Sequence, residues 1–209
     1  MIRQLNEEST IHGILVQLPL PRQIRAKHIL DLIMPEKDVD GFHPVNVGRI
    51  STGTGGLVPC TPLGCMMLLE RVIPDFRGMN AVVIGKSNIV GKPMALLLLE
   101  RECTVTIAHI YTKGLSDITC QADIIVIAAG SPGLVRGSWV KCGAVVVDVG
   151  INRIASASGK SIVVGDAALG EMEHAAYLTP VPGGVGPMTI ACLLANTVKA
   201  ALCQSTTSL

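Results

Sequence analysis

The sequence predicts an α/β fold in which helices cover both faces of a parallel sheet. Short runs rich in Val and Ile alternate along the chain with longer stretches of helical spacing. The runs are apolar throughout rather than at every second residue, which is typical of strands buried on both faces. Of the 209 residues, 49% are hydrophobic and only 16% are charged. A chain of this length can bury a sizeable core without disulfide bonds.

The first sixty residues predict one strand, one helix and a loop. The apolar run GILVQLP at 13–19 is typical of a buried strand. At 22–33 the spacing of Ile24, Ile29 and Ile33 indicates a helix, which Pro35 ends. The stretch 38–56 is polar and rich in glycine, so we expect a loop there.

From residue 62 onward, strands and helices alternate closely. A helix is expected at 62–73, because Pro62 suits a first turn and Pro74 lies just past the end. The runs AVVIG at 81–85 and DIIVIAA at 123–129 predict strands. Further strands are expected at 104–109, 144–150 and 161–164, and further helices at 91–102 and 189–202. Shifts in composition near 59–62 and 180–187 predict two crossings between domains.

Charge and composition exclude several classes of partner. Lys and Arg number 17 against 16 Asp and Glu, and no basic stripe is visible. Aromatic residues are 2% of the chain, too few for stacking nucleic-acid bases. Apolar stretches such as 94–99 are too short to cross a bilayer, and the N-terminus lacks the apolar segment of a signal peptide. We therefore expect neither a nucleic-acid nor a membrane partner.

Cysteine and histidine spacing argues against a metal site. The seven cysteines form no CxxC pair, and the five histidines form no HExxH motif. Several cysteines lie in apolar runs, where a reduced thiol behaves as a small apolar group. We expect reduced thiols in a cytoplasmic protein and no metal site.

The segment GKSNIVG, from Gly85 to Gly91, lies between a predicted strand and a predicted helix. Gly85 permits a sharp reversal, and the N–H groups that begin the helix attract an anion. Ser87 can donate to a phosphate, and Lys86 adds a positive charge suited to a 2′-phosphate. The spacing GxSxxxG differs from GxGxxG, so an ordinary strand–helix turn is the alternative. No carboxylate follows the strand at 104–109, where Ile110 stands, which favours a phosphorylated ribose.

Three further features are unusual for plain loops and are candidates for a binding site. Gln17 lies at the end of an apolar run and is followed by Pro19 and Pro21, so it faces a cleft or partner or is a satisfied core residue. Asp40 can accept two parallel hydrogen bonds from a ring like an aminopyrimidine, while Asp38 caps the turn. The segment PVPGGVGPMT at 180–189 is rigid at its prolines and allows close approach at its glycines. This segment suits a flat ring packed on the backbone or, alternatively, a hinge between domains. Thr189 is expected near the N-terminal cap of the helix that follows.

Six segments together resemble a known family. In chain order they are VQLPLP at 16–21, EKDVDGFHPVNVG at 36–48, PCTPLG at 59–64, GKSNIVGKP at 85–93, VDVGIN at 147–152 and TPVPGGVGPMT at 179–189. They resemble the bifunctional methylenetetrahydrofolate dehydrogenase/cyclohydrolase family. The resemblance implies a partial α/β folate-binding catalytic domain at 1–58 and an NAD(P)-binding Rossmann domain at 59–180. It also implies that a C-terminal helix within 181–209 returns to the first domain.

The resemblance implies a reaction and a set of residues. Methylenetetrahydrofolate would be oxidised with NADP, or alternatively NAD, and the methenyl product hydrolysed to 10-formyltetrahydrofolate, in a cytoplasmic homodimer. Gln17 would orient a catalytic lysine and Asp40 would hold the pterin edge. The implied cofactor-binding residues are Gly85, Lys86, Ser87, Ile110, Ile151 and Thr189. The implied folate-binding residues are Val16, Gln17, Leu18, Asp40, Pro182, Gly183, Gly184, Val185, Gly186, Pro187, Met188, Thr189 and Ile190.

The sequence departs from the family pattern in two places. The family's general acid/base is the lysine of a Tyr-x-x-x-Lys segment that precedes VQLPLP, and this chain has no such segment. A remnant that binds cofactor and folate without catalysing cyclohydrolysis is therefore an alternative, as is a different Rossmann oxidoreductase. Lys27, Lys37 and Lys92 are expected to be solvated on the surface. The family often carries Arg in place of Lys86 and Ser or Arg in place of Ile110, which keeps NAD as the alternative cofactor.

Overall fold

The computed structural model describes residues 1–155 and 159–206 and divides the chain into two compact units. The central unit is Thr61–Thr189. The terminal unit combines Met1–Cys60 with the C-terminal residues from Ile190 onward. The chain therefore leaves the terminal unit once and returns to it once.

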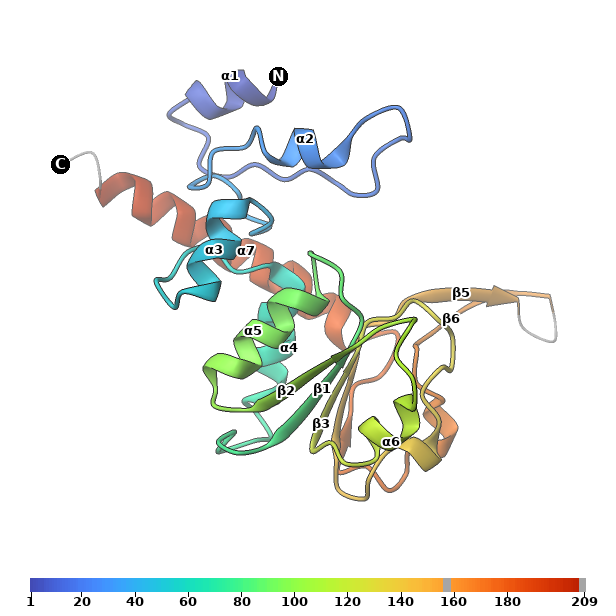
Figure 1. Cartoon of the computed structure of the whole chain (residues 1–209). Coiled ribbons are helices and arrows are strands. Elements are labelled where there is room, and N and C mark those ends of the chain that lie inside the picture. Colours follow the sequence, from blue (N-terminus) through green and yellow to red (C-terminus); the bar gives the residue numbers. More distant parts are fainter. Residues whose placement is uncertain (156–158, 207–209) are drawn as a thin grey trace. The chain divides into compact units, whose positions relative to one another are not determined.

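A five-stranded parallel sheet forms the middle of the central unit (Figure 1). Its strands are β1 (Asn80–Ile84), β2 (Thr104–Ala108), β3 (Ile124–Ile127), β4 (Val145–Asp148) and β7 (Tyr177–Leu178). They lie in the order β2-β1-β3-β4-β7, and every pairing is parallel. The predicted fold class is confirmed, and the first four strands lie where the apolar runs predicted them. Chain order reverses between β1 and β3, and ligands bind at such a point in open α/β sheets.

Both faces of the sheet are buried at its inner strands β1, β3 and β4, which explains why these strands are almost continuously apolar. Val83 and its neighbours on one face join a core with helices α4 and α5, while Val82 on the other face joins a core with α6, the 3-10 helix η1 and Met172, which directly follows the 3-10 helix η2. These helices are α4 (Cys60–Leu69), α5 (Gly91–Glu100), α6 (Leu115–Thr119), η1 (Gly137–Trp139) and η2 (Leu169–Glu171). The alternation follows from the two-residue repeat of a strand.

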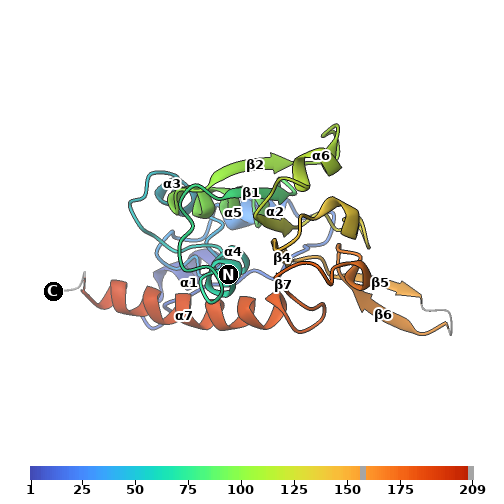
Figure 2. The same ribbon diagram turned by 90° about the horizontal axis from the view of Figure 1, so that it is seen from below.

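An antiparallel hairpin follows β4. Its strands are β5 (Asn152–Ala155) and β6 (Ser161–Val164), of which only β6 was predicted. The hairpin projects away from the parallel sheet in both ribbon views (Figures 1 and 2). Its base returns the chain to the carboxyl edge of the sheet, at Gly165.

The terminal unit contains three short helices and most of a long one. They are α1 (Ile2–Glu7), α2 (Ala26–Leu30), α3 (Pro44–Ser51) and α7 (Val185–Thr206). The prediction of a loop at 38–56 is wrong where α3 stands. Pro44 fits the first turn of α3, and the imidazole of His43 accepts a hydrogen bond from the N–H of Val45. The helix predicted at 22–33 is reduced to the five residues of α2.

The predicted buried strand at 13–19 is wrong. In the described part of the chain, Ile14 is the residue of this run that pairs, in a single parallel bridge with Asp38. The neighbouring Leu15 is 47% exposed. A strand extends only where a second backbone continues to pair with it, and β-branched sequence alone does not supply that partner.

Helix α7 is longer than the predicted 189–202. It begins at Val185 because Gly186 and Pro187 are accommodated in its first turn. Among the described residues it is the one helix long and apolar enough to cross a membrane, judged by length and composition. Our expectation that every apolar stretch is too short is therefore wrong for α7. One such helix is weak evidence for a membrane, because the core helix of a soluble protein passes the same test.

Candidate functional site

The turn between β1 and α5 lies at the carboxyl edge of the sheet and accepts only glycine at two positions. Gly85 has a φ of +127°, and a Cβ there would lie 2.3 Å from the carbonyl oxygen of Ala128. A Cβ on Gly91 would lie 2.1 Å from the carbonyl oxygen of Gly85. Both contacts are with backbone atoms, so no side-chain movement can relieve them. The absence of side chains leaves a backbone cradle in front of α5.

Ser87 organises this cradle. Its hydroxyl oxygen accepts hydrogen bonds from the N–H groups of Val90 (3.1 Å) and Gly91 (3.3 Å). The hydroxyl proton of Ser87 remains able to donate to an anion. Lys86 and Ser87 are both exposed, and the first turn of α5 directs its partial positive charge toward them. The cradle therefore fits a phosphate group, as the dinucleotide interpretation of the sequence requires.

The end of β2 presents no carboxylate. Ile110 is 90% exposed and lies just beyond the strand. The hydroxyl of Thr112 accepts a hydrogen bond from the N–H of His109 (2.8 Å), and the imidazole of His109 meets the ring of Tyr111 edge to face. An exposed apolar residue and a small polar turn occupy the place where a ribose-binding acid would stand.

A cavity of about 460 Å³ opens in the central unit beside β4 and the start of α7. It brings together Ile151, Thr189 and the predicted segment from Pro182 to Pro187. Met188 does not line it and instead packs against Gly64, where a Cβ would lie 2.8 Å from that of Met188. Thr189 is inside the first turns of α7 rather than at its cap, and its hydroxyl lies 2.9 Å from that of Thr61.

Part of the lining of this cavity was not predicted from the sequence. The residues not predicted are Thr61, Val90, Asp148, Val149, Gly150 and Val163. Asp148 carried a detectable signal, because it is an acid at the end of a strand that is otherwise apolar. Burial raises the pKa of Asp148, while hydrogen bonds from three backbone N–H groups oppose that rise.

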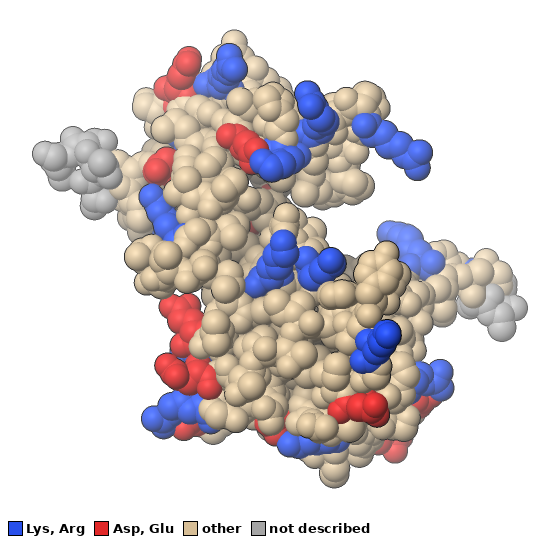
Figure 3. All heavy atoms as spheres, in the orientation of Figure 1, with Lys and Arg blue, Asp and Glu red and all other residues tan. Residues whose placement is uncertain are grey.

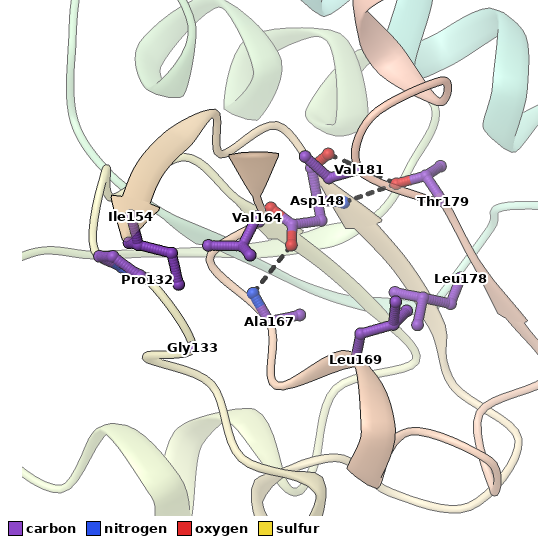
Figure 4. A pocket seen from close by; sticks show the side chains of 11 residues that line it. Pro132, Gly133, Asp148, Ile154, Val164, Ala167, Leu169, Leu178, Thr179 and Val181 are labelled. Carbon is purple, nitrogen blue, oxygen red and sulfur yellow. Dashed lines mark hydrogen bonds between the residues drawn. The ribbon is translucent and has the colours of Figure 1, made fainter. Parts of the chain in front are cut away.

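Asp148 and Val181 also line a second cavity, of about 310 Å³ (Figure 4). The walls of this second cavity are mostly apolar, with Ile154 and Val164 from the hairpin and Leu178 from β7. The wall shared by the two cavities is thus held by a buried carboxylate.

The other predicted site residues belong to the terminal unit. Gln17 is exposed, and its amide donates to the carbonyl of Leu18 (3.0 Å), so it is not the satisfied core residue considered above. Asp40 is half-buried. Burial and the neighbouring charge of Asp38 raise the pKa of Asp40 to about 6. Val16 is half-buried and Ile190 is exposed.

Asp38 and Lys37, two charged residues close to Asp40 in the chain, are both held by hydrogen bonds within the terminal unit. Asp38 is buried and accepts hydrogen bonds from the N–H of His43 (2.8 Å) and the amide of Asn46 (2.9 Å), so it holds the turn that leads into α3. Lys37 contradicts our expectation of a solvated surface lysine. It is only 6% exposed, and its ammonium donates to the carbonyls of Leu5, Asn6 and Glu8 at the end of α1. A buried ammonium is tolerated there because its three protons are all satisfied.

Nucleophilic and metal chemistry receive no support from the described residues. Burial, with a smaller contribution from Asp40, raises the pKa of the Cys60 thiol to about 12, so this thiol stays neutral. Within residues 1–155 and 159–206, no group of three His, Cys, Asp or Glu side chains is placed to hold a metal ion. On the face drawn in Figure 3, Lys and Arg side chains are scattered rather than gathered into one stripe.

Comparison with protein families decides the assignment. The NAD(P)-binding domain of tetrahydrofolate dehydrogenase/cyclohydrolase matches residues 59–205, and the catalytic domain of the same family matches residues 1–40. This chain belongs to the tetrahydrofolate dehydrogenase/cyclohydrolase family. The match at 59–205 includes the phosphate cradle and all of α7 except its last residue. The finer domain limits predicted at 58/59 and 180/181 stay a prediction, and residues 207–209 lie outside the described part of the chain.

Individual relatives agree with the family match. Bifunctional protein FolD 1 of Rhizorhabdus wittichii is 71% identical over 201 residues, which are 96% of this chain and 68% of that protein. The crystal structure of FolD from Campylobacter jejuni has a TM-score of 0.91 and 55% identity, over 96% of this chain and 70% of that one. The FolD of Trypanosoma brucei, solved with NADP and an inhibitor, has a TM-score of 0.90 and 44% identity over the same shares. The chain thus spans about two thirds of the length of these relatives.

Proposed function

We propose that this chain oxidises 5,10-methylenetetrahydrofolate to 5,10-methenyltetrahydrofolate with NADP and hydrolyses the product to 10-formyltetrahydrofolate. The observation that carries the proposal is the family match over the region that holds the phosphate cradle. The relatives bear the names of bifunctional proteins, which favours this function over a non-catalytic remnant. Membership in the family disfavours a different Rossmann oxidoreductase.

The central unit would hold the cofactor, which supplies a hydride acceptor when bound. Ser87 presents its hydroxyl proton to the phosphates, Gly85 leaves room for their close approach, and Lys86 neutralises their charge. Ile110 flanks the ribose, while Ile151 and Thr189 border the cavity beside β4. The apolar walls of that cavity exclude water from a reacting ring.

The terminal unit would hold the folate. Asp40 accepts two N–H bonds from the pterin edge, and Gln17 with Val16 and Leu18 borders the reacting carbon. The segment from Pro182 to Ile190 would contribute backbone groups to the same substrate. The homodimeric state, the cytoplasmic location and the preference for NADP over NAD belong to this proposal and follow from the family resemblance.

The decisive test is a dehydrogenase assay on the 209-residue chain. With methylenetetrahydrofolate and NADP, we expect the absorbance of the reduced cofactor to rise, followed by loss of the methenyl absorbance as it is hydrolysed. No reduction of NADP or NAD by a folded preparation would contradict the proposed function. Dehydrogenation without hydrolysis would restrict the function to the first step.

Lys86→Ala is expected to weaken NADP more than NAD. The lost charge-assisted contact to a 2′-phosphate corresponds to about 1 kcal/mol or more, roughly a tenfold rise in the NADP dissociation constant. Calorimetric titration of both cofactors measures the difference. Lys160→Ala removes an equal charge from the exposed edge of the hairpin and serves as the control. Equal losses for NADP and NAD would show that Lys86 does not contact the 2′-phosphate.

Folate affinity is expected to depend on the ionisation of Asp40. Because its pKa is raised to about 6, tetrahydrofolate should bind less tightly as the pH falls through that value. The raised pKa has the opposite effect on folding: the stabilising contribution of the neutral carboxyl is present below the ordinary value of 3.8 and is lost as pH rises through about 6.

Asp40→Asn should remove this pH dependence and raise the dissociation constant about tenfold at neutral pH. Asp31→Asn is the matched control, since Asp31 is an exposed carboxylate of the same unit that pairs with Lys27. Tetrahydrofolate titrations between pH 5 and pH 8 would compare the three proteins, a range of about three units centred near the expected midpoint. An unchanged pH profile in Asp40→Asn would reduce Asp40 to a turn residue.

A further inference from the structure

Asp166 connects three backbone groups of one loop. One oxygen of its fully buried carboxylate accepts hydrogen bonds from the N–H groups of Ala129 and Gly130, both at 2.8 Å. The other oxygen accepts from the N–H of Ser131 at 2.9 Å and from the side-chain amide of Asn152 at 2.7 Å. All four partners are donors, so a carboxylate satisfies them and a neutral amide cannot.

Asp148 holds Asp166 in place. Its Oδ1 accepts from the N–H groups of Gly150 (2.8 Å) and Asp166 (3.0 Å), and its Oδ2 accepts from the N–H of Ala167 (2.8 Å; Figure 4). The hydroxyl of Thr179 accepts from the N–H of Asp148 at 2.8 Å. Two carboxylates therefore tie together the loops that follow β3, β4 and β6.

Two glycines make room for these carboxylates. A Cβ on Gly150 would lie 2.3 Å from the carboxyl carbon of Asp166, and a Cβ on Gly165 would lie 1.9 Å from Oδ2 of Asp148. Gly150, two residues after Asp148, thus packs against Asp166. Gly165, the residue before Asp166, packs against Asp148. The arrangement is specific, because either glycine would displace a carboxylate if it carried a side chain.

The loop that Asp166 holds lies at the point where the strand order reverses. It follows β3, and the carbonyl of Ala128 at its start is in contact with Gly85 of the phosphate cradle. Ligands approach parallel sheets at this point, so the 129–131 backbone faces the place where the cofactor enters. A carboxylate that fixes this backbone also fixes one wall of the cofactor site.

We propose that Asp166, held by Asp148, is a positioning residue that fixes the 129–131 loop for cofactor binding. This inference rests on the proposed function, because it assumes that a dinucleotide occupies the cradle. Asp166 does not need to touch the cofactor. It acts through the N–H groups that it holds, so its loss should change cofactor affinity and not merely the stability of the unit.

A matched carboxylate separates positioning from stability. Asp123 lies at the opposite, amino end of the same sheet, where it accepts a hydrogen bond from the N–H of Asn80 (2.8 Å) and pairs with Lys141. Asp123→Asn removes the charge and the ion pair with Lys141 from the sheet without approaching the 129–131 loop. It should lower the melting temperature and leave the cofactor affinity within about twofold of the original.

The test compares NADP titrations of the original chain, Asp166→Asn and Asp123→Asn, with their melting temperatures recorded in parallel. Asp166→Asn should raise the NADP dissociation constant about tenfold or more, since two of the four hydrogen bonds to the carboxylate are lost whichever way the amide lies. Asn152→Ala, which removes one donor from the edge of the cluster, should raise it about threefold. This milder variant decides the question if Asp166→Asn does not fold.

The outcomes distinguish the two proposals. Failure of the original chain to bind NADP would overturn the proposed function, and the inference with it. Binding by the original chain with an unchanged dissociation constant in Asp166→Asn, or in Asn152→Ala where only that variant folds, would overturn the inference alone. An equal rise in Asp166→Asn and Asp123→Asn would assign Asp166 to general stability and would also overturn it.

Discussion

Gly91→Ala is expected to lower the free energy of unfolding by about 3 kcal/mol or more and to abolish measurable cofactor binding. The new methyl group would lie 2.1 Å from the carbonyl oxygen of Gly85 and 2.9 Å from the N–H nitrogen of Lys86. Relief of these contacts requires the β1–α5 turn to open, which separates the donors of the cradle. Urea unfolding and an NADP titration measure the two effects.

Gly170→Ala is the control for this substitution. Gly170 lies in η2 of the same unit, and a Cβ there would meet no atom within 4 Å. Its effect on unfolding should stay within about 0.5 kcal/mol, and NADP should bind as before. If Gly91→Ala behaved like Gly170→Ala, the turn would be more open than the structure describes.

Asn196→Ala is expected to have the largest effect in the terminal unit. Asn196 lies on α7, is 3% exposed, and donates to the carbonyls of Val39 (2.9 Å) and Val58 (2.8 Å). Removing the amide leaves two carbonyls without this donor and creates a small cavity, at a cost of about 2–4 kcal/mol. Because Val39 precedes Asp40, tetrahydrofolate binding should weaken with stability.

Ser205→Ala provides the comparison on the same helix. The hydroxyl of Ser205 donates only to the carbonyl of Ala201, one turn earlier, and the residue is exposed. Its removal should change the free energy of unfolding by no more than about 0.5 kcal/mol. Equal unfolding curves for Asn196→Ala and Ser205→Ala would contradict the role assigned to the buried amide.

The strands of the central unit were predictable because their local and long-range requirements agree. Runs such as AVVI before Gly85 favour extended backbone, and their continuous apolarity matches burial on both faces. The run at 13–19 has the same local preference, yet only Ile14 pairs. Pairing depends on another segment of chain, and no local pattern reports it.

Helix limits were less predictable than helix existence. Residues Gly183 and Gly184 predicted a loop that extends to Thr189, whereas α7 starts at Val185. The short helix α3 was missed because the polar stretch around it carries no apolar repeat, and its start is fixed by Pro44 and by contacts of Asp38. Capping contacts and packing decide at which residue of a turn a helix begins or ends. Residue preferences alone do not predict this position.

The sequence by itself determined the class of fold, the glycine-dependent turn at Gly85 and the family resemblance, because each depends on residues that are close together in the chain. Only the tertiary structure decided that Lys37 is buried at the end of α1 and that Asp166 holds the 129–131 loop. The bonds from Lys37 to the carbonyl of Asn6 and from the 129–131 loop to Asp166 join residues more than thirty positions apart. The partners of a buried charge are chosen by the folded chain, since burial is tolerated only where the fold supplies them.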